Sequence, residues 1–544
     1  MSARVVLKSA LLSAVFSLGM LALCTLSLPR VEAAASSEIK QVVDSGAGLE
    51  RSRKWVDAIE HYEKALKQWP ETSEIESALR RSKIYLGIER RYSDQSFIRM
   101  LPGLSRSEAL RMFDEILDHV QGRYVEPVTL QTFVAHGTES LWYALGDERF
   151  QKANIPARHH ADAKQVREIL FRDYWNKEIG SRNECTRVLS DLCNLCEQQL
   201  QLQAGPVIME FIFGGCNALD DYSGYLTPGR LNDLYGNIDG QFVGLGIEMK
   251  AEPGKGLLLM HVLPESPAAE GGLRSGEYIV GIDGKDCRNM NTDAAAGMLQ
   301  GREGTRVTLD IQGKVRKLPR QSTFTRRAVI VKSLPVVRII EGSDGVGYIQ
   351  MTSFQKSTVA ELDAALQKLR AEGMKSLIWD VRGNPGGLLT AAVEVLDRFI
   401  AEGAVVSTRG RTSDQNMSYS AHRSGTWNIP LVLLIDGDSA SASEIVAGAI
   451  RDYRRGTIVG RKSYGKWSVQ SIYNVSNNAG LRITTAKFYS PLGLTHSKVG
   501  VHPDIEVAIE KEKEATRFAD EVNFDTDKDI RKALEVLRGE LVSR

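Results

Sequence analysis

Long amphipathic stretches and short apolar runs follow one another along the chain and predict a mixed fold whose first part is helical. Three early stretches carry apolar side chains at helical spacing: residues 37–92, 107–145 and 163–202. Further on, residues 376–380 and 431–435 are short and continuously apolar, as buried strands are. An alanine-rich helix is expected over residues 442–453. The pattern therefore predicts a helical N-terminal region followed by an α/β core.

Polar residues that follow the second apolar run carry candidate chemistry. Ser439, Ser441 and Ser443 lie where the strand turns into the helix, so unpaired N–H groups and the helix dipole would stabilise an oxyanion there. Lys466 has no acidic residue close to it in sequence. Burial would lower its pKa and allow it to act as a base for one of the serines. Gln470 is placed to orient the amine.

A glycine pair after the first apolar run completes this constellation. Gly386 and Gly387 would let a backbone N–H approach a ligand, and the amide of Ala442 would supply a second oxyanion donor. Taken singly, a serine run is usually a helix cap, a lone lysine is solvated, and a glycine pair is a turn. The three in order favour a serine–lysine hydrolase, but they do not decide which serine attacks.

Other enzyme signatures fit the chain less well. Residues 460–466 match the phosphate-binding pattern G-x-x-x-x-G-K, but Trp467 stands where serine or threonine must hold magnesium. Neither the G-x-S-x-G elbow nor the H-E-x-x-H zinc helix occurs. No metal or organic cofactor is expected.

The ordered segments resemble the carboxyl-terminal processing (tail-specific) protease family. The matching segments are residues 380–388 (DVRGNPGGL), 439–444 (SASASE), 464–466 (YGK) with Gln470, and 481–491. The resemblance implies that Ser441 is the nucleophile, Lys466 the general base and Gln470 its orienter. The family usually has glycine after the lysine, whereas this chain has Trp467. The indole is expected either to desolvate the amine or to reshape the cleft.

A second resemblance precedes the catalytic segments. Short strands are expected at residues 256–262, 278–282 and 307–311, with a helix at 292–299. With the intervening turns, this region resembles a PDZ domain, in which Glu277 replaces the usual aspartate. The resemblance implies that the loop Gly244, Leu245, Gly246 and Ile247 receives a peptide's terminal carboxylate, since backbone N–H groups of such a loop can bind an anion.

The N-terminus has the pattern of an export signal. Basic residues precede an apolar stretch at 10–28 and small residues at 33–35, which predicts a signal peptide over residues 1–35. The protein is therefore expected to be exported, to a periplasmic or other extracytoplasmic location. The apolar stretch is also nearly long enough to span a bilayer. The alternative is therefore an uncleaved segment that anchors the protein in the membrane.

Composition adds an expectation about cysteines and excludes one class of partner. The chain has 544 residues and a formal net charge of +1, so nothing favours nucleic acid as a partner. In an exported protein, a disulfide is expected among Cys185, Cys193, Cys196 and Cys216, with Cys287 as a free thiol. Zinc is the weaker alternative because the spacing is uneven.

The expected organisation has six parts. They are a signal peptide (1–35), a helical, tetratricopeptide-like segment (36–100), a helical region with an insertion around 147–196 (101–237), a PDZ domain (240–320), an α/β protease domain (327–508) and a charged helical tail (509–544).

The expected function combines the PDZ domain with the protease domain. A carboxylate-reading domain tethered to a hydrolytic site delivers free protein tails to it at high effective concentration. The chain is thus expected to be a serine endopeptidase that cleaves exported proteins near apolar C-termini. The alternative is a PDZ scaffold for peptides with an impaired catalytic domain, in which Trp467 blocks the cleft. A small-ester hydrolase is disfavoured by the peptide-reading module.

Overall fold

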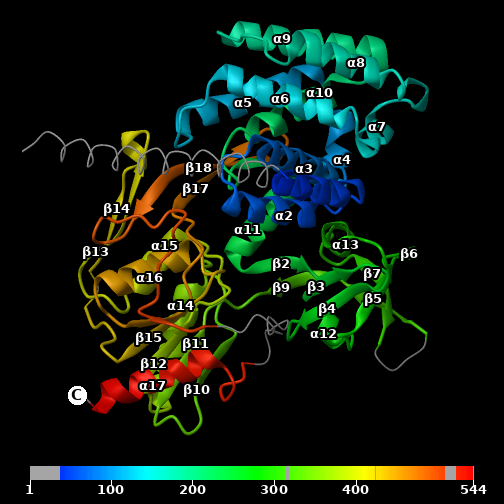
Figure 1. Cartoon of the computed structure of the whole chain (residues 1–544). Coiled ribbons are helices and arrows are strands. Elements are labelled where there is room, and N and C mark those ends of the chain that lie inside the picture. Colours follow the sequence, from blue (N-terminus) through cyan, green and yellow to red (C-terminus); the bar gives the residue numbers. More distant parts are fainter. Residues whose placement is uncertain (1–36, 314–317, 423, 509–521, 543–544) are drawn as a thin grey trace, which may run out of the picture.

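The computed structural model describes residues 37–313, 318–422, 424–508 and 522–542. Figure 1 shows a helical region at the top, a small β-rich domain at the lower right and an α/β domain at the lower left. The expected signal peptide lies outside the described residues. Within the described ranges, no helix combines the length and apolar character needed to cross a bilayer.

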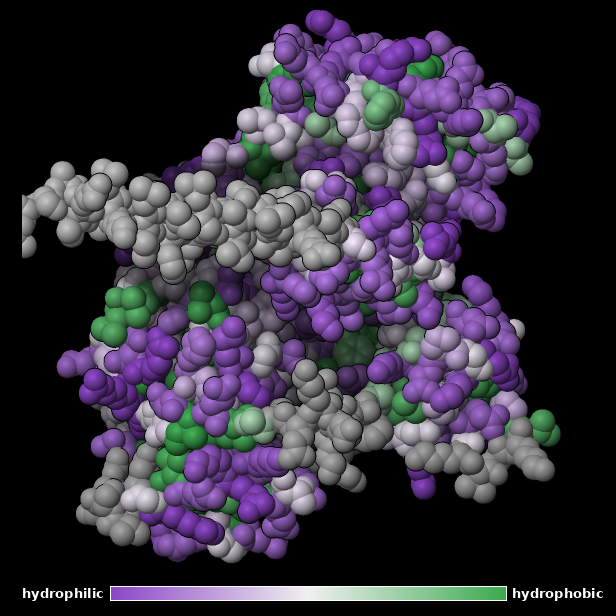
Figure 2. All heavy atoms as spheres, viewed as in Figure 1, coloured by the Kyte–Doolittle hydropathy of each residue, from purple (hydrophilic) through white to green (hydrophobic). Residues whose placement is uncertain are grey.

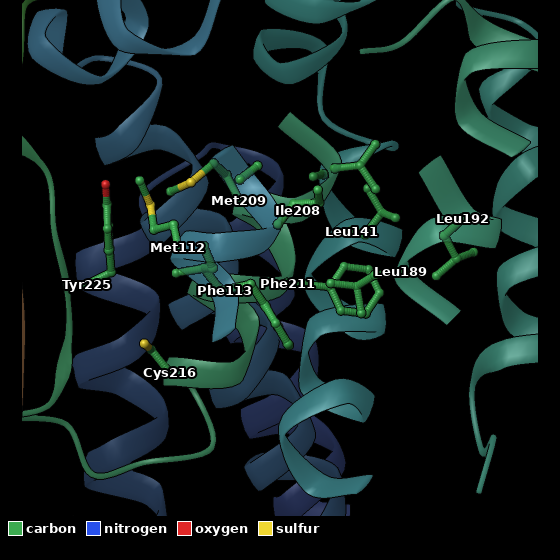
Figure 3. Close-up of a cluster of buried hydrophobic side chains, with 14 of the residues drawn as sticks. Met112, Phe113, Leu141, Leu189, Leu192, Ile208, Met209, Phe211, Cys216 and Tyr225 are labelled. Atoms are coloured by element: carbon green, nitrogen blue, oxygen red, sulfur yellow. The ribbon is translucent and has the colours of Figure 1, made fainter. Parts of the chain in front are cut away.

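Helices make up the N-terminal region, as the periodicity predicts. After a helical stretch at 37–51, the elements are α2 (Trp55–Gln68), α3 (Ser73–Arg91), α4 (Gln95–Met100), η1 (Leu101–Gly103), α5 (Arg106–Arg123), α6 (Leu130–Ala144), α7 (Glu148–Asn154), η2 (Ala157–His159), α8 (Ala163–Ile169), η3 (Leu170–Tyr174), α9 (Arg182–Leu200), α10 (Ala204–Cys216) and α11 (Pro228–Asp239). Helices α6 and α10 pack closely at Gly214. A Cβ there would lie 2.3 Å from the carbonyl oxygen of His136, so glycine is needed for this approach. The core beside them contains Phe113, Phe211 and Leu141 (Figure 3).

An antiparallel sheet joins this helical region to the catalytic domain. Its strands are β1 (Gly224–Leu226), β13 (Gly403–Gly410), β14 (Ser418–Ala421), β17 (Ser468–Val475) and β18 (Ala479–Tyr489), with η4 (Ser413–Gln415) beside them. The order is β1-β18-β13-β14, and β17 also pairs with β18. Tyr225, Leu481 and Ile483 are buried in the same core as the helices. The sheet therefore brings the segment before β1 next to the region around Lys466.

The β-rich domain has the strands and helix expected of a PDZ-like fold. Its elements are β3 (Ile247–Glu252), β4 (Gly256–Val262), α12 (Pro267–Glu270), β5 (Tyr278–Ile282), β6 (Lys285–Asp286), α13 (Thr292–Leu299), β7 (Arg306–Gln312) and β8 (Arg320–Thr325). The sheet order is β3-β4-β5-β7-β8, so β3 is an edge strand. A separate two-stranded ribbon of β2 (Gln241–Gly244) and β9 (Arg327–Ile330) flanks the domain. Glu277 accepts a hydrogen bond from the Arg274 backbone and pairs with Arg320, so it holds the turn in which aspartate is usual.

The catalytic domain is built on a mixed sheet of order β10-β11-β12-β15-β16-β19, parallel from β11 onward. Its strands are β10 (Val336–Ile339), β11 (Val346–Gln350), β12 (Ser376–Asp380), β15 (Leu431–Ile435), β16 (Thr457–Gly460) and β19 (Ile505–Glu506). One face packs on α14 (Thr358–Ala371), α15 (Leu389–Leu396) and α16 (Ala442–Asp452). Because both faces are covered, β12 and β15 are buried at every residue.

The second face of this sheet is covered by the C-terminal helix α17 (Lys528–Val542) (Figure 1). Its residues Ile530, Ala533 and Leu537 are fully buried against alternate residues of the strands, among them Val432. The expected helix is present, but its description as a charged tail is wrong. Its apolar stripe completes the core of the α/β domain. Asp529 at its start is also buried, whereas Lys528, Arg531, Glu535 and Arg538 are exposed.

The expected disulfide is also wrong. All five cysteines in the described ranges, Cys185, Cys193, Cys196, Cys216 and Cys287, are free and buried. The three on α9 share the apolar stripe of that helix with valine and leucine, so they pack as small hydrophobic side chains. Figure 3 shows Cys216 at the edge of the same core. No group of three or more metal-binding side chains forms in the described part of the chain.

Candidate active site

Ser441 occupies the turn between β15 and α16 in a strained backbone conformation. Its φ is 55° and its ψ is −111°, a region that residues other than glycine rarely adopt. Strain of this kind is found at functional sites, where the surrounding fold holds the residue in place. The residue is the N-cap of α16, so its side chain lies at the positive end of the helix.

The hydroxyl groups of the three candidate serines differ in their partners. Ser439 is fully buried and donates to the carbonyl of Val381 at 2.8 Å. Ser443 is also fully buried and donates to the carbonyl of Asn384 at 2.9 Å. Ser441 is only partly buried, and its hydroxyl donates to no protein acceptor among the described residues. Of the three, Ser441 alone has a hydroxyl group that remains available.

A buried carboxylate joins the serine turn to the lysine loop. Glu444 is fully buried, and its Oε2 accepts from the backbone N–H of Ser441 at 2.9 Å and of Lys466 at 2.8 Å. Its Oε1 accepts from the hydroxyl of Ser463 at 2.6 Å and from the N–H of Gly465 at 2.7 Å. Burial raises the pKa of Glu444, and these hydrogen bonds partly oppose the rise. The carboxylate therefore fixes the serine turn and the lysine loop against each other.

The amine of Lys466 is partly buried and pairs with no carboxylate in the described structure. Burial lowers the pKa of Lys466, and the charge of Arg482 lowers it further. Asp220 and Glu444 act in the opposite direction, more weakly. The amine lies 4.6 Å from the centre of the Tyr222 ring. A lysine in this setting reaches its neutral form at a lower pH than an exposed lysine does.

The glycine loop lies against the serine turn. A Cβ on Gly386 would come within 2.8 Å of the Ser441 Cβ, and its φ is 103°, so only glycine allows this approach. The N–H of Gly386 donates to the side chain of Asn384 at 2.9 Å. In the described residues, the N–H groups of Gly387 and Ala442 have no protein acceptor. Of the expected oxyanion donors, Gly387 and Ala442 are therefore available, and Gly386 is already engaged.

Gln470 does not contact the amine that it is expected to orient. Its amide donates to the Ser468 hydroxyl at 2.9 Å and to the Thr484 hydroxyl at 3.2 Å. The pairing of β17 with β18 shifts register between Val469 and Gln470. The role of Gln470 stays a prediction.

Trp467 lies in the protein core and not in the cleft. The side chain is 1% exposed and packs on Phe488 and His496, with ring centres 4.7 and 4.8 Å away. Space for it exists because α16 has Gly448 opposite, where a Cβ would lie 2.9 Å from the indole. The expectation that Trp467 blocks or reshapes the cleft is therefore wrong.

The strand that leads to the glycine loop ends in a buried ionic network. Arg382, whose side chain is 4% exposed, pairs with Asp380 at 2.6 Å, with Asp527 at 3.0 Å and with Asp529 at 2.6 Å. Arg461 also pairs with Asp529, at 2.7 Å. The network ties the start of α17 to the base of the loop that carries the oxyanion donors.

The expected carboxylate-binding loop lies at the end of the open edge strand β3. Gly246 has a φ of 77°, and a Cβ there would lie 2.3 Å from the Ser266 side chain. The carbonyls of Leu245 and Gly246 accept from Ala268 and Leu263, which fixes the loop from its inner side. Helix α13 runs beside β3, and Thr292 accepts a hydrogen bond from the Ala251 N–H. An edge strand with a helix beside it is the arrangement that accepts an added peptide strand.

Comparison with known proteins gives two family matches and close relatives. Residues 345–507 match peptidase family S41, and residues 260–313 match the PDZ domain. The chain is 37% identical over 306 residues to the carboxy-terminal-processing protease of Bartonella bacilliformis, covering 55% of this chain and 69% of that protein. It is 33% identical over 324 residues to the carboxyl-terminal-processing protease of Synechocystis sp., covering 59% and 74%. The chain belongs to the carboxyl-terminal-processing protease family.

Among solved structures, the photosystem II D1 C-terminal processing protease matches 73% of this chain and 92% of its own, at 24% identity and a TM-score of 0.41. As a member of the carboxyl-terminal-processing protease family, the chain is a serine peptidase with a PDZ domain. Its substrates are therefore peptides or proteins. The expected fold class, a helical region with a PDZ domain and an α/β protease core, is confirmed.

Sequence reasoning missed three parts of this carboxyl-terminal-processing protease's site. Glu444 stands three residues after Ser441, the spacing of a capping box, and that signal could have identified it. Arg382 lies inside the resembling segment, but two of its acidic partners, Asp527 and Asp529, come from the far C-terminus. Tyr222 carries no signal in sequence, because only the pairing of β1 with β18 brings it to Lys466.

Proposed function

We propose that the protein is a Ser441–Lys466 endopeptidase that removes or cuts near the C-terminal tails of exported proteins. One observation carries the assignment of the dyad. Glu444, a buried carboxylate, accepts hydrogen bonds from the backbone N–H groups of both Ser441 and Lys466. Ser441 has a strained backbone and an available hydroxyl, and the partly buried amine of Lys466 pairs with no carboxylate among the described residues.

The chemistry follows from this arrangement. Neutral Lys466 accepts the proton from the Ser441 hydroxyl as its oxygen attacks the scissile carbonyl carbon. The oxyanion that forms accepts hydrogen bonds from the N–H groups of Gly387 and Ala442. When the C–N bond breaks, the lysine ammonium gives its proton to the leaving amine. Water then attacks the acyl-enzyme with Lys466 again as base, and Ser441 is regenerated.

The direction of the pH dependence follows from the lysine. Only the neutral amine accepts the serine proton, so kcat/KM rises with pH through the pKa of Lys466. Burial and Arg482 lower that pKa. The rise should therefore be centred below the value of about 10.4 that is typical of a free lysine side chain.

Mutation of the dyad tests the assignment. Ser441→Ala and Lys466→Ala should each abolish cleavage of a peptide with an apolar C-terminus, and Lys462→Ala, an exposed lysine on the same loop, should cleave at the wild-type rate. Circular dichroism should show the same fold in all three. Cleavage by Ser441→Ala at more than a few per cent of the wild-type rate would rule out this nucleophile.

The loop Gly244–Ile247 at the edge of β3 supports recognition of a free C-terminal carboxylate. The test compares kcat/KM for two peptides of the same sequence, one with a free C-terminal carboxylate and one with a C-terminal amide. The amide should be cleaved with a kcat/KM at least tenfold lower. Equal rates for the two peptides would mean that the loop does not read chain ends.

Export is the last part of the proposal. It is supported by the basic, apolar and small-residue pattern of residues 1–35. Sequencing the N-terminus of the protein isolated from its native cells should place the first residue near residues 34–36. An intact residue 1 together with membrane association would instead indicate an uncleaved anchor.

A further inference from the structure

The amine of Lys466 rests on an aromatic ring that no family motif discussed above includes. Its Nζ lies 4.6 Å from the centre of the Tyr222 ring, within the distance at which an ammonium is attracted to a ring face. Within the described residues no hydrogen bond joins this amine to Ser441. The ring face is therefore a contact of the site that can hold the amine in place.

Tyr222 is itself fixed on both sides of its backbone. Its N–H donates to Asp220 at 3.2 Å, and its carbonyl accepts from the Arg482 side chain at 2.9 Å. Burial raises the pKa of its hydroxyl, and the neighbouring Tyr464, two residues before Lys466, raises that pKa further. The backbone of Tyr222 is thus anchored to β18 through Arg482, and its side chain lies near Tyr464 of the lysine loop.

We propose that Tyr222 is the positioning residue for the general base, and that its ring face both places the amine of Lys466 and favours the protonated form. The inference rests on the proposed dyad. Burial and Arg482 disfavour the ammonium, whereas Asp220, Glu444 and the ring favour it. The ring therefore limits how far burial can lower the pH at which the base becomes neutral.

Substitutions at Tyr222 should shift the acidic limb of the kcat/KM–pH profile in opposite directions. Tyr222→Leu removes the ring face and should move the limb to lower pH by roughly half to one unit, the equivalent of a cation–π contact. Tyr222→Trp offers a stronger ring face and should move it to higher pH. Tyr222→Phe keeps the ring face and loses the hydroxyl, so its limb should stay within about 0.2 units of wild type, as expected from the same contact.

The measurement separates this role from a merely structural one. At the pH optimum, Tyr222→Leu should lower kcat at least fivefold with KM changed less than twofold, because the ring orients the base and does not bind substrate. Thermal unfolding of the whole chain checks that each variant is folded. Limbs that coincide in the Leu, Phe and Trp variants, or that all move the same way, would overturn the proposal.

The dyad and the ring fail in different ways. If Lys466→Ala keeps its activity, the proposed function is wrong, whatever the Tyr222 variants do. If Lys466→Ala is inactive and the three Tyr222 profiles coincide, the dyad stands and only the role of the ring is rejected.

Discussion

Replacing Trp467 with alanine distinguishes a core residue from a cleft residue at the position where this chain departs from its family. The indole is 1% exposed and packed between Phe488, His496 and Gly448. Truncation of a buried tryptophan to alanine costs about 3–5 kcal/mol, because the packing is lost and a cavity remains. For a domain of this size, that corresponds to a fall in melting temperature of roughly 6–20 °C.

Trp467→Phe refines this estimate. The indole N–H has no acceptor among the described residues, so its removal breaks no hydrogen bond and relieves a desolvation cost of about 1–3 kcal/mol. This relief offsets part of the packing lost with the larger ring. Trp467→Phe should therefore be destabilised by less than about 1.5 kcal/mol, as other conservative core exchanges are.

Calorimetry of the full chain measures these effects, and kcat is measured well below the melting temperature of each variant. The control is Phe171→Ala, which removes an aromatic residue that is 61% exposed and should change stability by less than about 0.5 kcal/mol. In the folded state, Trp467→Ala should keep a KM close to wild type. A melting temperature within about 1 °C of wild type, together with a severalfold higher kcat, would refute the core assignment and place the indole in the cleft.

Three further predictions test other parts of the structure. Gly387→Ala should lower kcat more than 100-fold, since a Cβ there would lie 2.1 Å from the Phe354 carbonyl; kinetics with circular dichroism checks this, and wild-type activity would contradict it. Arg382→Met should destabilise the protein by about 3–5 kcal/mol because it removes the cation that pairs with the buried Asp380; an unchanged urea midpoint would show that the network is dispensable. Without reductant, denatured protein should expose at least five thiols to Ellman's reagent; fewer would reveal a disulfide.

Local pattern was enough to locate the site but not to complete it. The apolar runs at 376–380 and 431–435 are neighbouring parallel strands in the structure, so the loops after them meet at one edge of the sheet. This is why the glycine pair and the serines come together. Which serine has a free hydroxyl depends on carbonyls of residues 381 and 384, which are about 60 positions away in the chain, and no local pattern encodes such partners.

Two of the wrong predictions, the disulfide and the charged tail, have a common physical cause. The oxidising compartment of an exported protein favours a disulfide, but the cysteines of α9 lie on its apolar stripe and pack as hydrophobic side chains. The C-terminal segment was interpreted through its charge, but the spacing of Ile530, Ala533 and Leu537 decides which face is buried. In both cases the position on a helix face determines the role of a residue, and composition does not.

Glu444 shows that the site is kept at a cost to folding. Burial raises its pKa despite four hydrogen-bond donors, so the folded protein binds that proton more tightly than the unfolded chain does. A raised pKa contributes stability at low pH and loses it as the pH rises through the folded value. Above the ordinary pKa of a glutamate, Glu444 therefore works against folding. The same carboxylate fixes the geometry of the site. Its Oε2 accepts from the backbone N–H groups of both Ser441 and Lys466, so the serine turn and the lysine loop keep a constant separation.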